Sequence, residues 1–303
     1  MDITSSEQLE LEPIRSPSVA TAPPVPSDGV LAFIDSTSGG INAAWRAALV
    51  ARDHGRPLHL VSIQSHASDA AAAKALLQEL ALQLETRIQV RASTTAVASD
   101  MRECVTALAA GKDLVVVPRQ PSESWADKVL GTLPERMLRW LAIPLLVVRR
   151  PANASYRRVL ASVKLDADAE RQIGAARFMA RGQALRVFHV LEPGAEGSLR
   201  LADVSDLTVS LHRQRRLERA HLEIEALIDR AGARGSGASG LIAFGHVSRR
   251  VLDAARGHNA QLIVIGSGRR SAFGDVFFGG LVQDLVREAE ADLLVLPQRQ
   301  GEA

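Results

Sequence analysis

The stretch Pro144-Leu-Leu-Val-Val148 recurs later in the chain as Asp292-Leu-Leu-Val-Leu296, at an offset of 148 residues. A second pair, Val30-Leu-Ala32 and Val159-Leu-Ala161, recurs at an offset of 129 residues. The chain therefore contains two copies of one unit. Because the two offsets differ by 19 residues, the second copy carries an insertion, which we assign to residues 194–211.

Each copy alternates short apolar runs with amphipathic segments. The run Val30–Ile34 is apolar throughout, as expected for a parallel strand that is covered on both faces. The next apolar residues are spaced as on one face of a helix: Ile41, Ala44, Trp45, Ala48 and Leu49. Both copies follow the order β-α-β-α-β-α-β-α-β, which predicts an α/β fold with open parallel five-stranded sheets flanked by helices.

The pattern also predicts the individual elements. The expected strands of the first copy are 30–34, 58–63, 87–92, 113–117 and 144–148, and its last helix is expected within 125–141. The expected strands of the second copy are 157–163, 184–191, 240–244, 261–265 and 292–296. A linker of five residues, 151–155, is short enough that the two copies should pack against each other.

Composition narrows the class of protein. The chain has 303 residues, is 47% hydrophobic and 23% charged, and has a net charge of +2, which favours a soluble globular protein and argues against a nucleic-acid partner. Its single cysteine excludes a disulfide framework, and its histidines lack metal-binding spacing, so we expect no metal. No run approaches the ~20 apolar residues of a membrane span. Without a signal-like start, we expect a cytoplasmic protein.

Residues 1–28 differ from the rest of the chain. They contain five of the 13 prolines and carry five acidic side chains against one basic side chain. Such a segment buries too little apolar surface to offset the entropy of ordering it. We therefore expect a disordered tail at 1–28, followed by domains at 29–150 and 156–298.

The second copy ends with a glycine-rich loop, Leu262-Ile-Val-Ile-Gly-Ser-Gly-Arg-Arg-Ser-Ala-Phe-Gly-Asp-Val-Phe-Phe-Gly-Gly280, then a helix and the strand 292–296. This ending, the repeat length and the polar turns after the first strands are shared with one known family. In these features the chain resembles the universal stress protein (UspA-like) family in its tandem form, over about residues 29–298. The resemblance implies two tandem Rossmann-like domains of the adenine nucleotide alpha hydrolase-like type. It also implies that strands 144–148 and 292–296 pair, which makes an intramolecular pseudo-dimer.

Nucleotide-binding members of the family have a loop of the form Gly-x-x-Gly, nine residues, then Gly-Ser/Thr. Small residues let the backbone wrap phosphate oxygens, and the next helix directs its first N–H groups at the anion. The second copy has Gly266, Arg269, Gly279 and Gly280 at these positions, with Ser267 and Gly268 between the first two. It therefore keeps part of the loop, although the hydroxyl is missing.

The first copy has Pro118, Pro121, Gly131 and Thr132 at the same positions. Proline lacks an N–H donor and fixes φ. We therefore expect the first copy not to hold a triphosphate in the family manner, although it keeps the Gly-Thr pair.

The family's other contact is an acid after the first strand, which faces the base. Asp35 matches it in the first copy, whereas the second copy has Lys164 there and Asp166 two residues later. The end of the second strand, at Val190, is the next candidate contact. Simpler alternatives stay open: Asp35 can cap the following helix, Lys164 can be a solvated strand-end residue, and the loop 266–280 can be a plain connection.

The sequence contains no nucleophile elbow, P-loop or paired carboxylates, so we assign no catalytic residue. The resemblance implies a regulatory or stress-survival module that is not an enzyme and acts by binding a ligand or a partner. The alternatives are an ATP-binding protein that uses the second copy with Mg²⁺, for which slow ATP hydrolysis stays open, and a non-nucleotide interaction scaffold. A homodimer and an unidentified protein partner stay open, and we expect no membrane or nucleic-acid partner.

Overall fold

The structure is a computed structural model. It describes residues 29–64, 69–98, 100–119, 131–192, 206–267 and 280–298. The predicted tail 1–28 and residues 194–205 of the predicted insertion lie outside the described residues.

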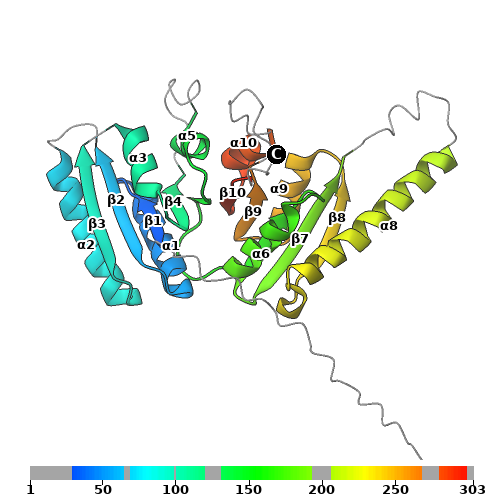
Figure 1. The fold of residues 1–303 in the computed structure, drawn as a ribbon, viewed down its shortest axis with the longest axis horizontal. Helices are drawn as coiled ribbons and strands as arrows, with labels where there is room; N and C mark the ends of the chain where they lie inside the picture. The colour runs from blue at the N-terminus through cyan, green and yellow to red at the C-terminus, as the bar shows by residue number, and fades with distance from the viewer. Residues whose placement is uncertain are drawn as a thin grey trace, which may run out of the picture.

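Each half of the chain supplies five parallel strands, as the alternating pattern predicts (Figure 1). In the first half these are β1 (Val30–Phe33), β2 (Leu58–Gln64), β3 (Ala92–Ala98), β4 (Leu114–Pro118) and β5 (Leu145–Val148). In the second half they are β6 (Arg158–Ser162), β7 (Ala184–Leu191), β8 (Ser239–Phe244), β9 (Leu262–Gly266) and β10 (Asp292–Leu296).

The two halves join into one ten-stranded sheet, in the order β3-β2-β1-β4-β5-β10-β9-β6-β7-β8. The junction is antiparallel, with Leu146 of β5 opposite Leu294 of β10. This confirms the expected pairing of strands 144–148 and 292–296. Both strands are buried along their whole length, so pairing them covers the edge that each half would otherwise expose.

Helices cover both faces of the sheet and divide the interior into two cores. One face carries α1 (Ser38–His54), α2 (Ala70–Ile88), α6 (Ala169–Ala180) and α8 (Asp206–Arg230). The other carries α3 (Met101–Ala109), α5 (Leu133–Trp140), α9 (Val247–Gly257) and α10 (Gly280–Glu288). Successive strand residues alternate between the cores: Leu145 lies in the second core and Leu146 in the first.

The third strand was predicted wrongly at 87–92. Helix α2 continues to Ile88 and ends at Gln89, which has a left-handed conformation (φ 57°), and β3 follows at Ala92–Ala98. This strand lies at the edge of the sheet and is only half-buried. It can therefore carry a serine and two threonines, and it lacks the continuous apolar run by which the other strands were recognised.

Two further predicted segments are described only in part. Of the expected helix 125–141, the structure shows α5 at Leu133–Trp140, and residues 120–130 lie outside the described part. Helix α8 begins at Asp206, so the last residues of the predicted insertion belong to this helix. None of the described helices is long and apolar enough to cross a bilayer.

Candidate functional site

The predicted ligand residues follow the carboxyl ends of neighbouring parallel strands. In the first half β1 pairs with both β2 and β4, and in the second half β6 pairs with both β7 and β9. At these points the strand order reverses, and ligands of open α/β sheets bind there. The fold therefore forms two equivalent positions, one after β1 and β4 and one after β6 and β9.

In the first half, Asp35 stabilises the turn that begins α1. Its carboxylate accepts hydrogen bonds from the N–H of Thr37 at 3.1 Å and from the Thr37 hydroxyl. Thr37 Oγ1 in turn accepts from the N–H of Gly40 at 3.0 Å, which caps the helix. A Cβ on Gly40 would lie 2.4 Å from the Asp35 carbonyl oxygen, so only glycine fits there. The contacts thus agree with the capping interpretation of Asp35.

Gly131 and Thr132 lie directly before α5, where the resemblance implies a phosphate. The Thr132 N–H donates to Glu135 Oε2 at 2.7 Å, and the Thr132 hydroxyl donates to the same oxygen at 3.1 Å. Gly131 has φ +84°, and a Cβ there would lie 3.0 Å from that oxygen. The helix start therefore already holds an anion, the carboxylate of its own first turn.

The second half of the chain helps to hold that carboxylate. Arg287 of α10 forms an ion pair with Glu135 at 3.4 Å, and Arg119, directly after β4, donates to the Arg287 carbonyl oxygen at 3.1 Å. Glu135 is 6% exposed, so its charge is largely removed from water. A phosphate in this position would meet a buried negative charge.

In the second half, Gly266 ends β9 and lies against α6. A Cβ on Gly266 would come 2.6 Å from Nε2 of Gln172, which is itself buried. Ser267 donates its N–H to the Leu296 carbonyl oxygen at 2.8 Å, and its hydroxyl oxygen accepts from the N–H of Gln298 at 3.2 Å. Both residues therefore have a packing role. The other candidates in this loop, Gly268, Arg269 and Gly279, lie outside the described residues.

Gly280 opens α10, and its surroundings contrast with those of Thr132. A Cβ on Gly280 would meet no atom of the described chain within 4 Å, and the first turn of α10 contains no acidic residue. The helix start is exposed and has no carboxylate of its own turn. As far as the described residues reach, the start of α10 has no carboxylate on its N–H groups, whereas the start of α5 has one.

The remaining candidates of the second half are divided between surface and core. Lys164 and Asp166 are exposed after β6, and the Asp166 carboxylate accepts from the N–H of Asp168 at 3.0 Å. The side chain of Val190 is buried in the second core, on β7. Its neighbour His189 forms a hydrogen bond to the Val163 carbonyl oxygen at 3.0 Å. The fold therefore brings Lys164, Asp166 and Gly266 to one sheet edge, whereas Val190 is paired with Ala243 of β8.

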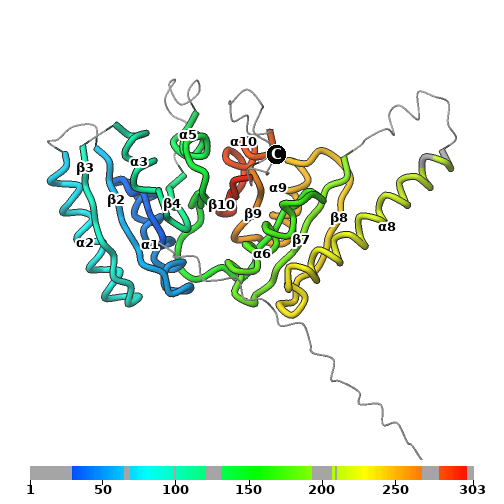
Figure 2. Tube along the Cα trace, viewed as in Figure 1, coloured from blue at the N-terminus to red at the C-terminus, as the bar shows by residue number. Residues whose placement is uncertain are grey.

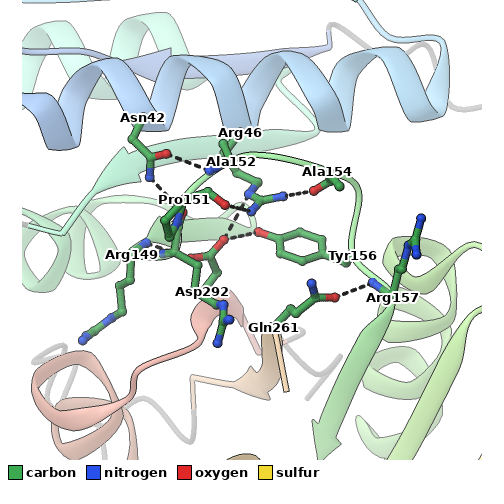
Figure 3. Close-up of polar contacts among 11 residues, drawn as sticks. Asn42, Arg46, Arg149, Pro151, Ala152, Ala154, Tyr156, Arg157, Gln261 and Asp292 are labelled. Carbon is green, nitrogen blue, oxygen red and sulfur yellow. Dashed lines mark hydrogen bonds and ion pairs between the residues drawn. The ribbon is translucent and has the colours of Figure 1, made fainter. Parts of the chain in front are cut away.

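The sequence analysis did not find a buried network around Asp292, which is fully buried at the start of β10 (Figure 3). Its carboxylate accepts from the Tyr156 hydroxyl at 2.6 Å and lies 3.1 Å from Nε of Arg46. The N–H groups of Arg149 and Arg150 donate to its other oxygen at 2.7 and 2.8 Å. The sequence offered one signal of this network: the second copy has the acid Asp292 at the position where the first copy has Pro144.

The same network anchors the linker between the halves. Arg46 of α1 donates to the carbonyl oxygens of Pro151 and Ala154 at 3.2 and 2.7 Å, and its guanidinium lies over the Tyr156 ring. Asn42 of α1 holds the linker further by donating to one backbone group and accepting from another. The two halves are thus joined by polar contacts as well as by the β5–β10 pairing.

Arg149, which follows β5, reaches across to the second half. Its guanidinium donates to the carbonyl oxygens of Ala289, Leu285 and Val286 at the end of α10. A cation there is favourable, because the last carbonyls of a helix carry partial negative charge. Burial, with a smaller effect from nearby Arg119, lowers the Arg149 pKa to about 10.

Within the described part of the chain, no cluster of three histidine, cysteine or acidic side chains is arranged to hold a metal ion.

Comparisons with known proteins agree with this architecture. Residues 155–297 match the model of the universal stress protein family. A universal stress protein from Archaeoglobus fulgidus is 15% identical, with 90% of this chain and 97% of that chain covered and a TM-score of 0.65. A putative universal stress protein from Pseudomonas aeruginosa is 20% identical, with 90% and 94% covered and a TM-score of 0.63.

A functionally unknown protein from Pseudomonas aeruginosa is also similar, at 20% identity, with 90% and 93% covered and a TM-score of 0.62. The search of curated proteins found no match. The structural likeness extends over both halves and establishes a shared fold. Residues 155–297 of this chain thus match the universal stress protein family, and the first half of the chain repeats the fold of that segment.

Proposed function

We propose that this protein is a regulatory module of the universal stress type, with domains at 29–150 and 156–298, in which only the second domain binds a nucleotide. The observation that carries the proposal is the contrast between two helix starts. The Glu135 carboxylate bonds to Thr132 at the start of α5, whereas a Cβ on Gly280 at the start of α10 would meet no atom of the described residues within 4 Å. An anionic ligand is repelled at the first position and attracted at the second.

The surroundings of the second position fit a phosphate. Lys164 is exposed at the same sheet edge and supplies a positive charge. The candidate ligand is ATP, whose phosphates would lie at the start of α10. Its Mg²⁺ would be held mainly by the phosphates, because the described residues form no acidic cluster for it. We assign no catalytic group to this site, so the module would act through the bound state.

Calorimetric titration of the full chain with ATP and Mg²⁺ tests the proposal. Gly280→Asp places a carboxylate at the helix start, as Glu135 does in the first domain, and it should weaken binding at least ~10-fold, which is about 1.4 kcal/mol. Gly235→Asp is the matched control, since Gly235 is also exposed and also has open space around it. It should leave the affinity unchanged.

Two results would overturn the proposal: no heat of binding at millimolar ATP, or equal affinity in the wild type and Gly280→Asp. A direct readout is mass spectrometry of small molecules released from the purified protein. An adenine nucleotide that co-purifies with the wild type and is lost in Gly280→Asp supports the same site.

A second candidate function is a non-nucleotide interaction scaffold. The observation that favours it is the group of exposed leucines on α8. This helix contains the last residues of the predicted insertion. Deleting residues 192–211 should then abolish capture of protein partners in a pull-down. Unchanged partners would count against the scaffold.

A further inference from the structure

Helix α8 extends well beyond the body of the molecule. Its C-terminal half packs on the sheet through four buried apolar side chains: Ala220, Ile224, Leu227 and Ile228. Its N-terminal half runs outward past β8, at the right of the view in Figure 1 and in the trace of Figure 2. The outer turns of the helix therefore have little of the described protein to pack against.

This helix nevertheless carries most of the large apolar side chains that are exposed. Among the described residues six such side chains are exposed, and four belong to α8: Leu207, Leu211, Leu217 and Leu222. Leu222 is 73% exposed and Leu207 68%. A cluster of exposed leucines on one helix is typical of an interaction surface.

Three of these leucines share the face that points away from the sheet. Leu211 and Leu222 are about three helical turns apart, at 3.6 residues per turn, and therefore lie on one line along the helix, and Leu207 is one turn earlier. Ile224, on the buried side, lies nearly opposite Leu222 around the helix axis. The leucines on the outward line are thus not part of the core.

Two opposite charges lie between the leucines. Leu211, Arg215, Glu218 and Leu222 are spaced by four, three and four residues, which is the spacing of a coiled-coil seam. Arg215 and Glu218 are both exposed, and a shallow depression of about 570 Å³ runs beside Arg215, Glu218 and Leu222. Along the outward face, an apolar side chain is thus followed by a positive one, a negative one and a second apolar one.

We propose that a second copy of this chain docks on this face, with the two α8 helices antiparallel about a two-fold axis between residues 216 and 217. Reversal about that axis places Leu211 against Leu222 of the partner subunit, and Arg215 against Glu218 of the partner subunit. Each contact occurs twice, because a two-fold interface repeats every pair. The face is therefore complementary to itself in both apolarity and charge, and this selects the second copy as occupant.

The docking does not depend on nucleotide binding, because α8 makes none of the contacts at the start of α10. One pair of helices of this length buries less than the ~1,200 Å² of a standard interface. The dimer should therefore be weak and reversible, and should form as the protein concentration rises through the micromolar range.

Analytical ultracentrifugation of the full chain at increasing concentration tests the proposal. The wild type should shift reversibly from monomer to dimer. Arg215→Glu and Glu218→Arg each place like charges opposite each other and should leave a monomer. An equimolar mixture of these two variants should dimerise again, and so should the double variant Arg215→Glu/Glu218→Arg, because both restore opposite charges.

Matched leucine variants distinguish docking through this face from non-specific association through any exposed leucine. Leu222→Glu should abolish the dimer, whereas Leu82→Glu, at an equally exposed leucine of α2, should leave it unchanged. All these side chains are exposed, so the variants should keep the far-ultraviolet circular dichroism of the wild type.

Disulfide trapping tests the antiparallel register in a Cys104→Ser background. A mixture of Leu211→Cys and Leu222→Cys chains should form a cross-linked dimer. Leu222→Cys alone should not, because two copies of residue 222 would be ~16 Å apart at 1.5 Å per residue, beyond the ~7 Å limit between disulfide Cα atoms.

A monomer at all concentrations would overturn the proposal. So would a dimer that both charge variants retain, or one that cross-links through Leu222→Cys alone.

Discussion

The guanidinium Nε of Arg46 lies 3.1 Å from Oδ2 of Asp292, although their side chains are only 4% and 0% exposed. Arg46 belongs to α1 in the first half and Asp292 begins β10 in the second. The pair is thus a buried ionic contact between the halves, at the point where β5 and β10 meet. Removing one charge leaves the other buried and uncompensated.

Asp292→Asn should therefore lower the free energy of unfolding by about 3–5 kcal/mol, as removal of one member of a buried pair does. Denaturant unfolding followed by circular dichroism measures this. Adding Arg46→Met should recover part of the loss, since it removes the stranded charge. For comparison, Glu85→Gln breaks an exposed pair with Arg91 and should cost about 1 kcal/mol or less. Equal effects at both sites would show that burial does not set the strength of the pair.

Tyr156→Phe should remove a hydrogen bond to the Asp292 carboxylate and cost about 1.5–3 kcal/mol at neutral pH. It should also change the response to alkaline pH. Burial, reinforced by the Asp292 charge, raises the Tyr156 pKa well above 10.

The folded state therefore keeps this proton after the unfolded chain has lost it. The stability contributed by Tyr156 is fully present below pH 10 and is lost as the pH rises towards the folded-state value. Unfolding free energies measured from neutral to alkaline pH should fall more steeply in the wild type than in Tyr156→Phe. Parallel curves would contradict this prediction.

Gly40→Ala should destabilise the protein by about 1–3 kcal/mol, because the added methyl group would meet the Asp35 backbone and cannot move away from it. The adjacent Gly39→Ala is a close control. Its methyl group would lie 3.5 Å from Thr37 Oγ1, an ordinary contact, so this change should be neutral or stabilise by up to about 1 kcal/mol. Thermal melting of both variants decides the prediction, and a similar loss in both would refute it.

His54 of α1 stacks on Phe178 of α6, with ring centroids 3.7 Å apart. Burial lowers the pKa of His54 below 6.5, the Asp53 charge opposes this, and the Arg181 charge adds to it. Phe178→Ala exposes the imidazole and should raise its pKa towards 6.5, which an NMR titration of the ring protons measures. An unchanged pKa would mean that the stacking does not bury the ring.

The same shift predicts a response to acid. The unfolded chain binds the His54 proton at a higher pH than the folded protein does. The stability that neutral His54 contributes is therefore present above pH 6.5 and is lost as the pH falls through the folded-state value. His54→Phe keeps an aromatic ring against Phe178 and should lack this component in unfolding experiments near pH 6. If the variant and the wild type lose stability equally there, His54 is not responsible.

The sequence by itself determined the repeated parallel architecture. Runs such as Val30–Ile34 and Leu262–Ile265 are apolar at every position, and only a strand covered on both faces uses such a run. The order of these runs placed Asp35, Lys164 and Gly266 at the carboxyl ends of parallel strands. Where the run was polar, at β3, the prediction was wrong, because an edge strand need not be apolar on both sides.

Only the tertiary structure decided which charges lie at the two equivalent helix starts. The prolines of the first copy argued against a triphosphate there, but the sequence did not show that Glu135 bonds to Thr132 and pairs with Arg287 of the other half. The Asp292 network likewise draws on α1, the linker and β10 together. Local patterns specify strands and helices, whereas the charge at a site depends on side chains that only the packing of both halves brings within a few ångströms.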